Sequence, residues 1–262
     1  MQLLTRSALV ITLVAGFSIP LGYIVAHPIP IVFMFHSITN DTQDSPHVSP
    51  LRFRAFVKTI QKQADPIEIT TDSSDASIYS EFFPILREHG LTATIFVLPL
   101  AVESEGMLTW DQIREMDQAG FTIGSHTLTH QWLPDLTDEE IAHELCQSKL
   151  LIEREVRHPI TTLAYPYGAF DRRVQQRAQK CGYTQAYTTA PGRRFLDNDP
   201  LALKRVYVSE TTLTHPALEW LALSRFYIAA RELALFLLPI DVPRRPESMN
   251  EREGRVHQQG ER

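Results

Sequence analysis

The stretch Phe121-Thr-Ile-Gly-Ser-His126-Thr-Leu-Thr-His130 predicts a buried strand that runs into a turn of small and polar residues. Its two histidines stand four residues apart, so a single turn or tight loop can direct both imidazoles at one metal ion. They directly follow a strand, and α/β folds usually place their chemistry at the carboxyl ends of strands. By itself this spacing is equally compatible with two histidines that cap or cover a loop.

Two other segments predict strand ends that carry polar groups. The β-branched run Ile67–Thr71 is followed by Asp72-Ser-Ser-Asp75 and then by a helical pattern over residues 77–89. The run Leu163-Ala-Tyr-Pro-Tyr-Gly168 predicts a strand that breaks at Pro-Tyr-Gly, a turn whose backbone N–H groups can face a ligand. We expect these strand ends and the histidine pair to converge on one mouth.

In their order along the chain, these motifs resemble the polysaccharide deacetylase family, also called the NodB-homology family, over roughly residues 31–223. His126 to His130 matches the family's second motif, and Tyr165-Pro-Tyr-Gly168 resembles its third. Phe35-His-Ser-Ile38 is similar to the Tyr-His-x-Ile strand of some members. Further matches follow the same order at residues 48–53, 72–97, 182–188 and 204–206.

The resemblance implies hydrolysis of N-acetyl groups on a polysaccharide by a divalent metal that one Asp and two His hold, with a neighbouring Asp as the base. Asp72 aligns with that base, and His126 and His130 align with the two histidine ligands. The backbone N–H of Tyr167 aligns with the oxyanion contact, and His36 takes the role of the acid by position. Zinc is the metal expected first, with cobalt or nickel as alternatives. Without the resemblance, a histidine at the position of His36 is better explained as hydrogen-bonding a neighbouring loop.

The chain departs from the family at its first motif, where Thr-Phe-Asp-Asp-Gly is replaced by Thr70-Thr-Asp-Ser-Ser74. Ser73 therefore stands where the family has its metal-binding Asp, and a neutral hydroxyl is a much poorer ligand than a carboxylate. Either Asp75 substitutes for the missing ligand, or Asp72 binds the metal and leaves the base role vacant. The alternative function is a catalytically degenerate glycan-binding or accessory protein.

Arg205 follows a short apolar run and is a candidate to orient Asp72, in place of an Arg that other members carry before the third-motif Pro. An arginine at this position is equally compatible with a surface ion pair.

Strand and helix patterns alternate along the chain, which predicts a parallel α/β architecture. The apolar, β-branched runs are Ile31–Phe35, Ile67–Thr71, 92–97, 121–125, 161–165, 184–188 and 203–208, and the helical patterns cover 51–64, 77–89, Trp110–Gln118, Asp138–Val156 and 171–180. The resemblance implies a single domain that forms a distorted, incomplete (β/α)7 barrel. The spacing alone also allows an open doubly wound sheet.

Composition limits the classes of function. A chain of 262 residues with 44% hydrophobic content can build one sizeable core, and its net charge of −6 gives no basic surface for nucleic acid. Cys146 lies in a helical pattern and Cys181 precedes a Gly-Tyr pair, so they can form a disulfide only if the fold brings them together. We expect two isolated buried thiols.

The N-terminus carries the signal for localisation. Arg6 precedes an apolar stretch over residues 8–26, and Lys and Arg are then absent until Arg52. This asymmetry of positive charge favours an N-terminus on the cytoplasmic side of the membrane and an extracytoplasmic domain. We expect residues 1–26 to be an uncleaved signal anchor, attached to the membrane, or a signal peptide. Residues 27–238 are expected to form the deacetylase-like domain with a C-terminal helix, and residues 239–262 a disordered tail.

Overall fold

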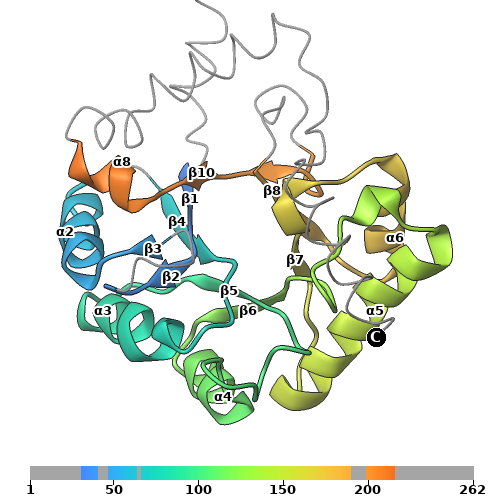
Figure 1. The fold of residues 1–262 in the computed structure, drawn as a ribbon, viewed down its shortest axis with the longest axis horizontal. Helices are drawn as coiled ribbons and strands as arrows, with labels where there is room; N and C mark the ends of the chain where they lie inside the picture. Colours follow the sequence, from blue (N-terminus) through green and yellow to red (C-terminus); the bar gives the residue numbers. More distant parts are fainter. Residues whose placement is uncertain (1–30, 41–46, 64–65, 190–198, 216–262) are drawn as a thin grey trace, which may run out of the picture.

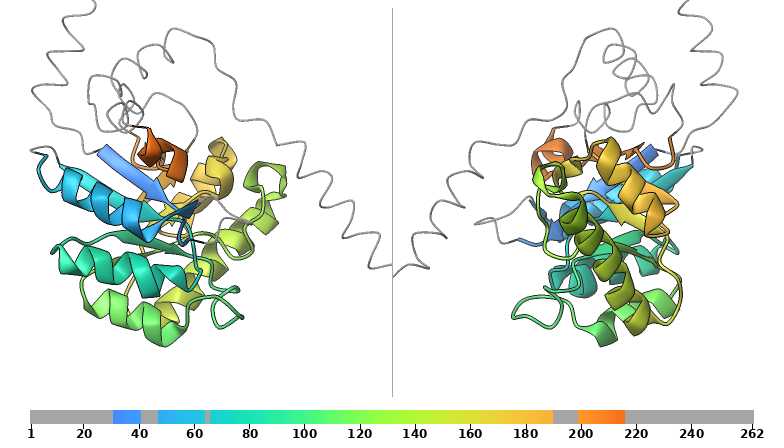
Figure 2. Two further views of the ribbon diagram at one scale, coloured as in Figure 1. Left: turned by 60° about the vertical axis from the view of Figure 1, so that its left-hand side comes forward. Right: turned by 90° about the vertical axis from the view of Figure 1, so that its right-hand side faces the viewer.

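The computed structural model describes residues 31–40, 47–63, 66–189 and 199–215. They form a nearly closed, barrel-like sheet of eight parallel strands in the order β10-β1-β4-β5-β6-β7-β8-β9, with helices around its outer face (Figure 1). Figure 2 shows α2, α3 and α4 side by side on one flank of the sheet, with α5 on the other. The expected barrel is confirmed, and an open doubly wound sheet is not formed.

The strands of this sheet are β1 (Ile31–Phe35), β4 (Ile67–Thr71), β5 (Thr94–Val97), β6 (Thr122–Ser125), β7 (Thr162–Ala164), β8 (Gln185–Thr188), β9 (Leu203–Lys204) and β10 (Val206–Tyr207), and a small second sheet pairs β2 (Ser37–Ile38) with β3 (His47–Val48). The α-helices of the described residues are α2 (Pro50–Ile60), α3 (Phe83–Glu88), α4 (Trp110–Gln118), α5 (Asp138–Val156), α6 (Arg172–Lys180) and α8 (Glu210–Thr214). A π-helical turn, η1 (Ile78–Phe82), leads into α3, and two 3-10 turns are η2 (Leu133–Asp135) and η3 (Pro166–Gly168).

The last expected strand differs from the prediction, because the run 203–208 forms two short strands. β9 pairs with β8, with Leu203 opposite Tyr187, whereas β10 pairs with β1, with Val206 opposite Phe33. Arg205 lies at the break between them and is buried, with 4% of its surface exposed. One continuous segment thus borders both edges of the sheet, which is why seven predicted runs give eight strands.

The core has two parts, because successive side chains of a strand point to opposite faces. The outer part lies between the sheet and the helices, and it contains the rings of Phe33, Phe35, Phe53 and Phe56 in edge-to-face contacts with centroids 5.0–5.2 Å apart. A smaller cluster on the other strand face comprises Val32, Phe96, Ala164, Tyr187 and Leu203. This second cluster fills the interior of the barrel beneath the strand ends that carry the predicted site.

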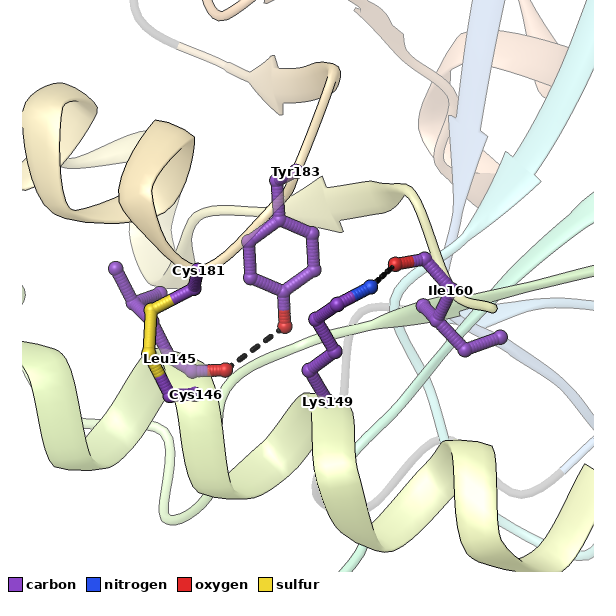
Figure 3. The surroundings of a disulfide bond; sticks show 6 residues. All are labelled: Leu145, Cys146, Lys149, Ile160, Cys181 and Tyr183. Atoms are coloured by element: carbon purple, nitrogen blue, oxygen red, sulfur yellow. Dashed lines mark hydrogen bonds between the residues drawn. A yellow bond between two sulfur atoms is a disulfide. The ribbon is translucent and has the colours of Figure 1, made fainter. Parts of the chain in front are cut away.

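Cys146 and Cys181 form a disulfide, so the expectation of two isolated thiols is wrong. Cys146 lies in α5 and Cys181 caps the C-terminus of α6, with Cα atoms 5.2 Å apart (Figure 3). Beside it, the Tyr183 hydroxyl donates to the Leu145 carbonyl at 2.9 Å, and the Lys149 ammonium donates to the Ile160 carbonyl. The pairing depends on the packing of two helices against each other, which the sequence does not show.

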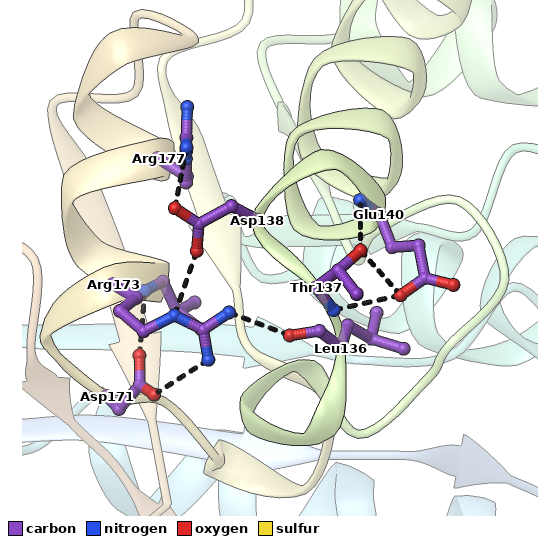
Figure 4. Close-up of polar contacts among 8 residues, drawn as sticks. Leu136, Thr137, Asp138, Glu140, Asp171, Arg173 and Arg177 are labelled. Carbon is purple, nitrogen blue, oxygen red and sulfur yellow. Dashed lines mark hydrogen bonds and ion pairs between the residues drawn. The ribbon is translucent and has the colours of Figure 1, made fainter.

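Polar contacts join the same two helices at the N-terminus of α5. The Asp138 carboxylate accepts from Arg173 Nε at 2.8 Å and from Arg177 Nη2 at 2.7 Å (Figure 4). Thr137 and Glu140 form a capping box at the start of α5, and Asp171 caps α6. The disulfide and these ion pairs fix α5 to α6 near both ends of α6.

The predicted N-terminal anchor or signal peptide, the C-terminal helix over residues 216–238 and the tail lie outside the described residues. Within the part of the chain that the structure describes, no helix is long and apolar enough to cross a bilayer.

Candidate active site

The predicted site residues gather at the carboxyl edge of the parallel sheet. His36 follows β1, Asp72 follows β4, His126 follows β6, and the turn η3 follows β7. The shared edge follows from the parallel pairing of β1 with β4, β4 with β5, β5 with β6 and β6 with β7. The structure therefore brings the ends of these four strands together at one mouth.

Asp72 and Arg205 form a buried, bidentate ion pair at the centre of this edge. Arg205 Nη1 lies 2.5 Å from Asp72 Oδ1 and Arg205 Nη2 lies 2.6 Å from Oδ2, with side chains 0% and 5% exposed. The guanidinium also donates to Thr70 Oγ1 at 3.2 Å and lies over the ring of Phe96. Burial would raise the pKa of Asp72, but the charge and hydrogen bonds of Arg205, together with His126, lower it to about 2. Asp72 is therefore a carboxylate across the physiological pH range, and Arg205 does not form a surface ion pair.

The two histidines of the second motif lie against each other, with ring centroids 4.8 Å apart. His126 is buried, and its Nδ1 lies 2.9 Å from the carbonyl of Ala164, so Nδ1 carries the proton and Nε2 keeps its lone pair. Burial lowers the pKa of His126, while burial and the neighbouring His126 lower the pKa of His130 to about 4. Both imidazoles are therefore neutral near pH 7.

Aromatic rings border this pair. Tyr167 lies between His130 and Trp132, with ring centroids 4.6 Å and 5.6 Å away, and its hydroxyl lies 3.1 Å from His130 Nδ1. Tyr167 has φ +58°, and the following Gly168 has φ +69°. A Cβ on Gly168 would lie only 2.4 Å from the backbone nitrogen of Thr189, so this turn is pressed against the end of β8 and requires glycine. The turn holds the Tyr167 side chain at the edge of the site.

His36 lies on the opposite side of the mouth, edge-on to Tyr207 with ring centroids 5.7 Å apart. Burial lowers its pKa, the charge of Asp72 opposes this, and the charges of His126 and Arg205 add to it. The Nδ1 atom of His36 is buried and has no hydrogen-bond partner among the described residues. Because a lowered pKa leaves His36 neutral near pH 7, it must first gain a proton before it can act as an acid.

Asp75 does not join His126 and His130 in a group of side chains that could hold a metal ion. Asp75 Oδ1 accepts from the backbone nitrogen of Ser77 at 2.7 Å, and Asp75 Oδ2 accepts from Ser37 Oγ at 2.5 Å. Ser73 Oγ accepts from the backbone nitrogen of Asp75 at 3.1 Å. One oxygen of Asp75 is thus bound at the residue that precedes η1, and the other is bound by β2.

The site does not fit the complete metal-ligand set that the resemblance implies. His126 and His130 fit as two nitrogen ligands, but Asp72 is bound to Arg205 and Ser73 offers only a hydroxyl. Among the described residues there is no group of three or more His, Cys, Asp or Glu side chains that could hold a metal ion.

Glu144 and Ser148, in α5, contact the histidine loop and were not predicted from the sequence. Glu144 Oε2 accepts from the backbone nitrogens of Leu128 and Thr129, and Ser148 Oγ lies 2.7 Å from Ser125 Oγ. Both side chains are buried. A signal was present, because these two polar residues fall within the apolar stripe of the helical pattern.

Comparisons with known proteins relate the chain to one family. A family model described as polysaccharide deacetylase matches residues 59–186. The chain is 35% identical over 141 residues to YxkH of Bacillus subtilis, which is named after the same family; the match covers 54% of this chain and 50% of that one. It is 26% identical over 118 residues to a peptidoglycan-N-acetylglucosamine deacetylase of Bacillus cereus, covering 45% and 53% of the two chains. The chain thus spans about half the length of the curated relatives it matches.

Solved structures show the same fold. BC0361, a polysaccharide deacetylase from Bacillus cereus, superimposes with a TM-score of 0.64 at 27% identity, covering 77% of this chain and 68% of that one.

Proposed function

Because this chain belongs to the polysaccharide deacetylase family, we propose that it removes N-acetyl groups from an extracytoplasmic polysaccharide. Peptidoglycan-N-acetylglucosamine is the substrate in the name of one relative, and we propose a glycan that contains N-acetylglucosamine for this chain. The observation that carries the proposal is the buried Asp72–Arg205 pair beside two neutral imidazoles at the carboxyl edge of the barrel.

Asp72 is the proposed base. Its pKa of about 2 keeps it ionised, and Arg205 holds the carboxylate plane in one orientation through two hydrogen bonds. Each carboxylate oxygen has a further lone pair, so Asp72 can take a proton from an attacking water. The low pKa makes Asp72 a weak base, and its contribution depends on precise placement of that water.

His36 and Tyr167 are proposed to act on the other groups of the substrate. His36 is the group that returns a proton to the leaving amine, once it has received one. The backbone N–H of Tyr167 is proposed to face the carbonyl oxygen as it gains negative charge. His126 and His130 would supply two nitrogen donors for zinc, cobalt or nickel, but Ser73 replaces the third ligand of the family.

An extracytoplasmic location is supported by the Cys146–Cys181 disulfide, since structural disulfides persist mainly in oxidising compartments. Residues 1–26 are proposed to direct export or to tether the domain to the membrane. The C-terminal helix and the disordered tail remain predictions for residues outside the described ranges.

A second candidate function, a non-catalytic glycan-binding or accessory protein, is favoured by Ser73 at the position of the family's ligand. The test is acetate release from an N-acetylglucosamine polymer, with and without zinc, by the wild type and by Asp72→Asn, Ser73→Asp and Asp111→Asn variants. Asp111 has an exposed side chain in α4 and serves as the control. Release that is lost in Asp72→Asn and kept in Asp111→Asn supports the enzyme. An inactive wild type with zinc-dependent activity in Ser73→Asp would instead identify the degenerate protein.

A further inference from the structure

Glu144 is a buried residue whose carboxylate is hydrogen-bonded to the loop of residues 126–130, the histidine loop, and it has no part in the proposed chemistry. Glu144 lies in α5, is 3% exposed and forms no ion pair among the described residues, whereas Lys149 of the same helix pairs with Glu153. Instead, Oε2 accepts from the backbone nitrogens of Leu128 at 3.0 Å and Thr129 at 2.9 Å, and Oε1 accepts from Thr129 Oγ1 at 2.5 Å. Three donors of one loop therefore satisfy a charge whose burial would otherwise be costly.

The loop between the two histidines has an unfavourable backbone conformation. Thr127 has φ +69° and His130 has φ +62°, in the left-handed region that β-branched residues in particular avoid. Within the loop, Thr127 donates its N–H to Ser125 Oγ at 3.1 Å, and His130 donates its N–H to Thr127 Oγ1 at 3.2 Å. These local bonds do not reach Leu128 and Thr129. Among the described residues, Glu144 alone accepts from the N–H groups of these two residues.

We propose that Glu144 is a positioning residue that holds the 126–130 loop in the left-handed conformation and so turns His130 toward His126. Ser148 supports it from the next turn of α5, through its hydrogen bond to Ser125. Glu144 contacts neither imidazole, and it acts on them only through the loop backbone. The catalytic consequence rests on the proposed function, whereas the effect on the loop does not.

The experiment compares Glu144→Ala with Glu144→Gln. A glutamine keeps an oxygen that can accept from both N–H groups, and the Thr129 hydroxyl can rotate to accept from the new amide. Ile152→Ala, a cavity in the same helix away from the loop, is the control for lost stability, and Glu139→Ala is the control for a lost exposed charge. The readouts are the imidazole NMR signals of His126 and His130 in folded protein at pH 8, and kcat/KM for acetate release.

In Glu144→Ala we expect shifted His126 and His130 signals and a loss of about 100-fold in kcat/KM, the scale on which misplacement by about 1 Å reduces catalysis. Glu144→Gln should restore both readouts to within a few-fold of the wild type, and the two control variants should leave the signals unchanged. Unshifted signals in Glu144→Ala, or the same shifts in Ile152→Ala, would overturn the proposal. If the wild type releases no acetate, deacetylation fails as a function, and the NMR signals still decide the role of Glu144.

Discussion

Replacement of Arg205 by leucine should change both the stability of the protein and the pH dependence of that stability. Arg205→Leu removes the only hydrogen-bond partner that the Asp72 carboxylate has among the described residues, and it leaves a charged side chain that is 5% exposed. Leaving one member of a buried ion pair uncompensated typically costs about 3–5 kcal/mol. At pH 7 we expect the free energy of unfolding to fall by about this amount.

The pH dependence follows from the pKa of Asp72. In the wild type it lies at about 2, against 3.8 for the unfolded chain, which corresponds to about 2.5 kcal/mol of stability that is present above pH 5 and is lost as the pH falls toward 2. In Arg205→Leu the largest remaining influence is burial, which raises the pKa of Asp72 above that of the unfolded chain. The folded variant then binds a proton more readily than the unfolded chain does, so lowering the pH stabilises it.

The assay is urea unfolding followed by tryptophan fluorescence at pH 7 and pH 4. The difference in unfolding free energy between wild type and variant should narrow at pH 4, by about 1.4 kcal/mol for each unit by which the variant's pKa exceeds 4. Asp72→Asn in the Arg205→Leu background provides the control, since it has no carboxylate to titrate and should show no narrowing. A difference that is the same at both pH values would refute the account of Asp72.

Three other predictions test the disulfide, the η3 turn and the histidines. Replacing Cys146 and Cys181 together by alanine should lower the free energy of unfolding by about 4 kcal/mol, because the bond closes a loop with a separation of 35 residues; equal urea midpoints with and without the bond would contradict this. Gly168→Ala should lower the free energy of unfolding more than Gly90→Ala does. Both glycines have positive φ, but a Cβ on Gly168 would lie 2.4 Å from a backbone nitrogen, whereas a Cβ on Gly90 would have no neighbour within 4 Å. The urea midpoint should therefore shift further for Gly168→Ala, and equal shifts would contradict this. His130 should stay neutral in NMR titrations down to pH about 4, whereas His158, hydrogen-bonded to Asp117, should protonate above pH 6.5. Because the unfolded chain binds a proton at His130 more readily than the folded chain does, this residue should lower the free energy of unfolding as the pH falls from 6.5 to 4. A His130 midpoint near 6.5 would disprove the burial argument.

The architecture could be predicted wherever one residue pattern determines one element. Trp110–Gln118 and Asp138–Val156 form helices with the predicted bounds, because Thr109 and Thr137 provide capping boxes before each apolar stripe. Ile31–Phe35 is a continuous apolar run buried in a parallel sheet, and Ile67–Thr71 is a largely β-branched run, interrupted by Glu68, whose last three residues are buried. The run 203–208 was predicted as one strand, since a buried arginine that interrupts it cannot be recognised without knowing its partner.

The site was predictable as a set of strand ends, but the contacts within it were not. Parallel strands place Asp72 and His126 at one edge, and no further information is needed for that step. The partners of Asp75 and Glu144 depend on Ser37 and on residues 128–129, which are distant in sequence and reveal nothing of the pairing by their type. The disulfide likewise depends on how α5 and α6 pack together.

The position of Arg205 between β9 and β10 has a consequence for how the protein is made. Synthesis proceeds from the N-terminus, so strands β1 to β8 and Asp72 leave the ribosome before the residue that neutralises Asp72. Until Phe33 pairs with Val206, a contact between the two ends of the described sheet, the nascent barrel must keep its central carboxylate hydrated or protonated. A nascent chain that stops before residue 203 should therefore remain open at its centre, and completion of the fold and of the candidate active site should be one late, cooperative event.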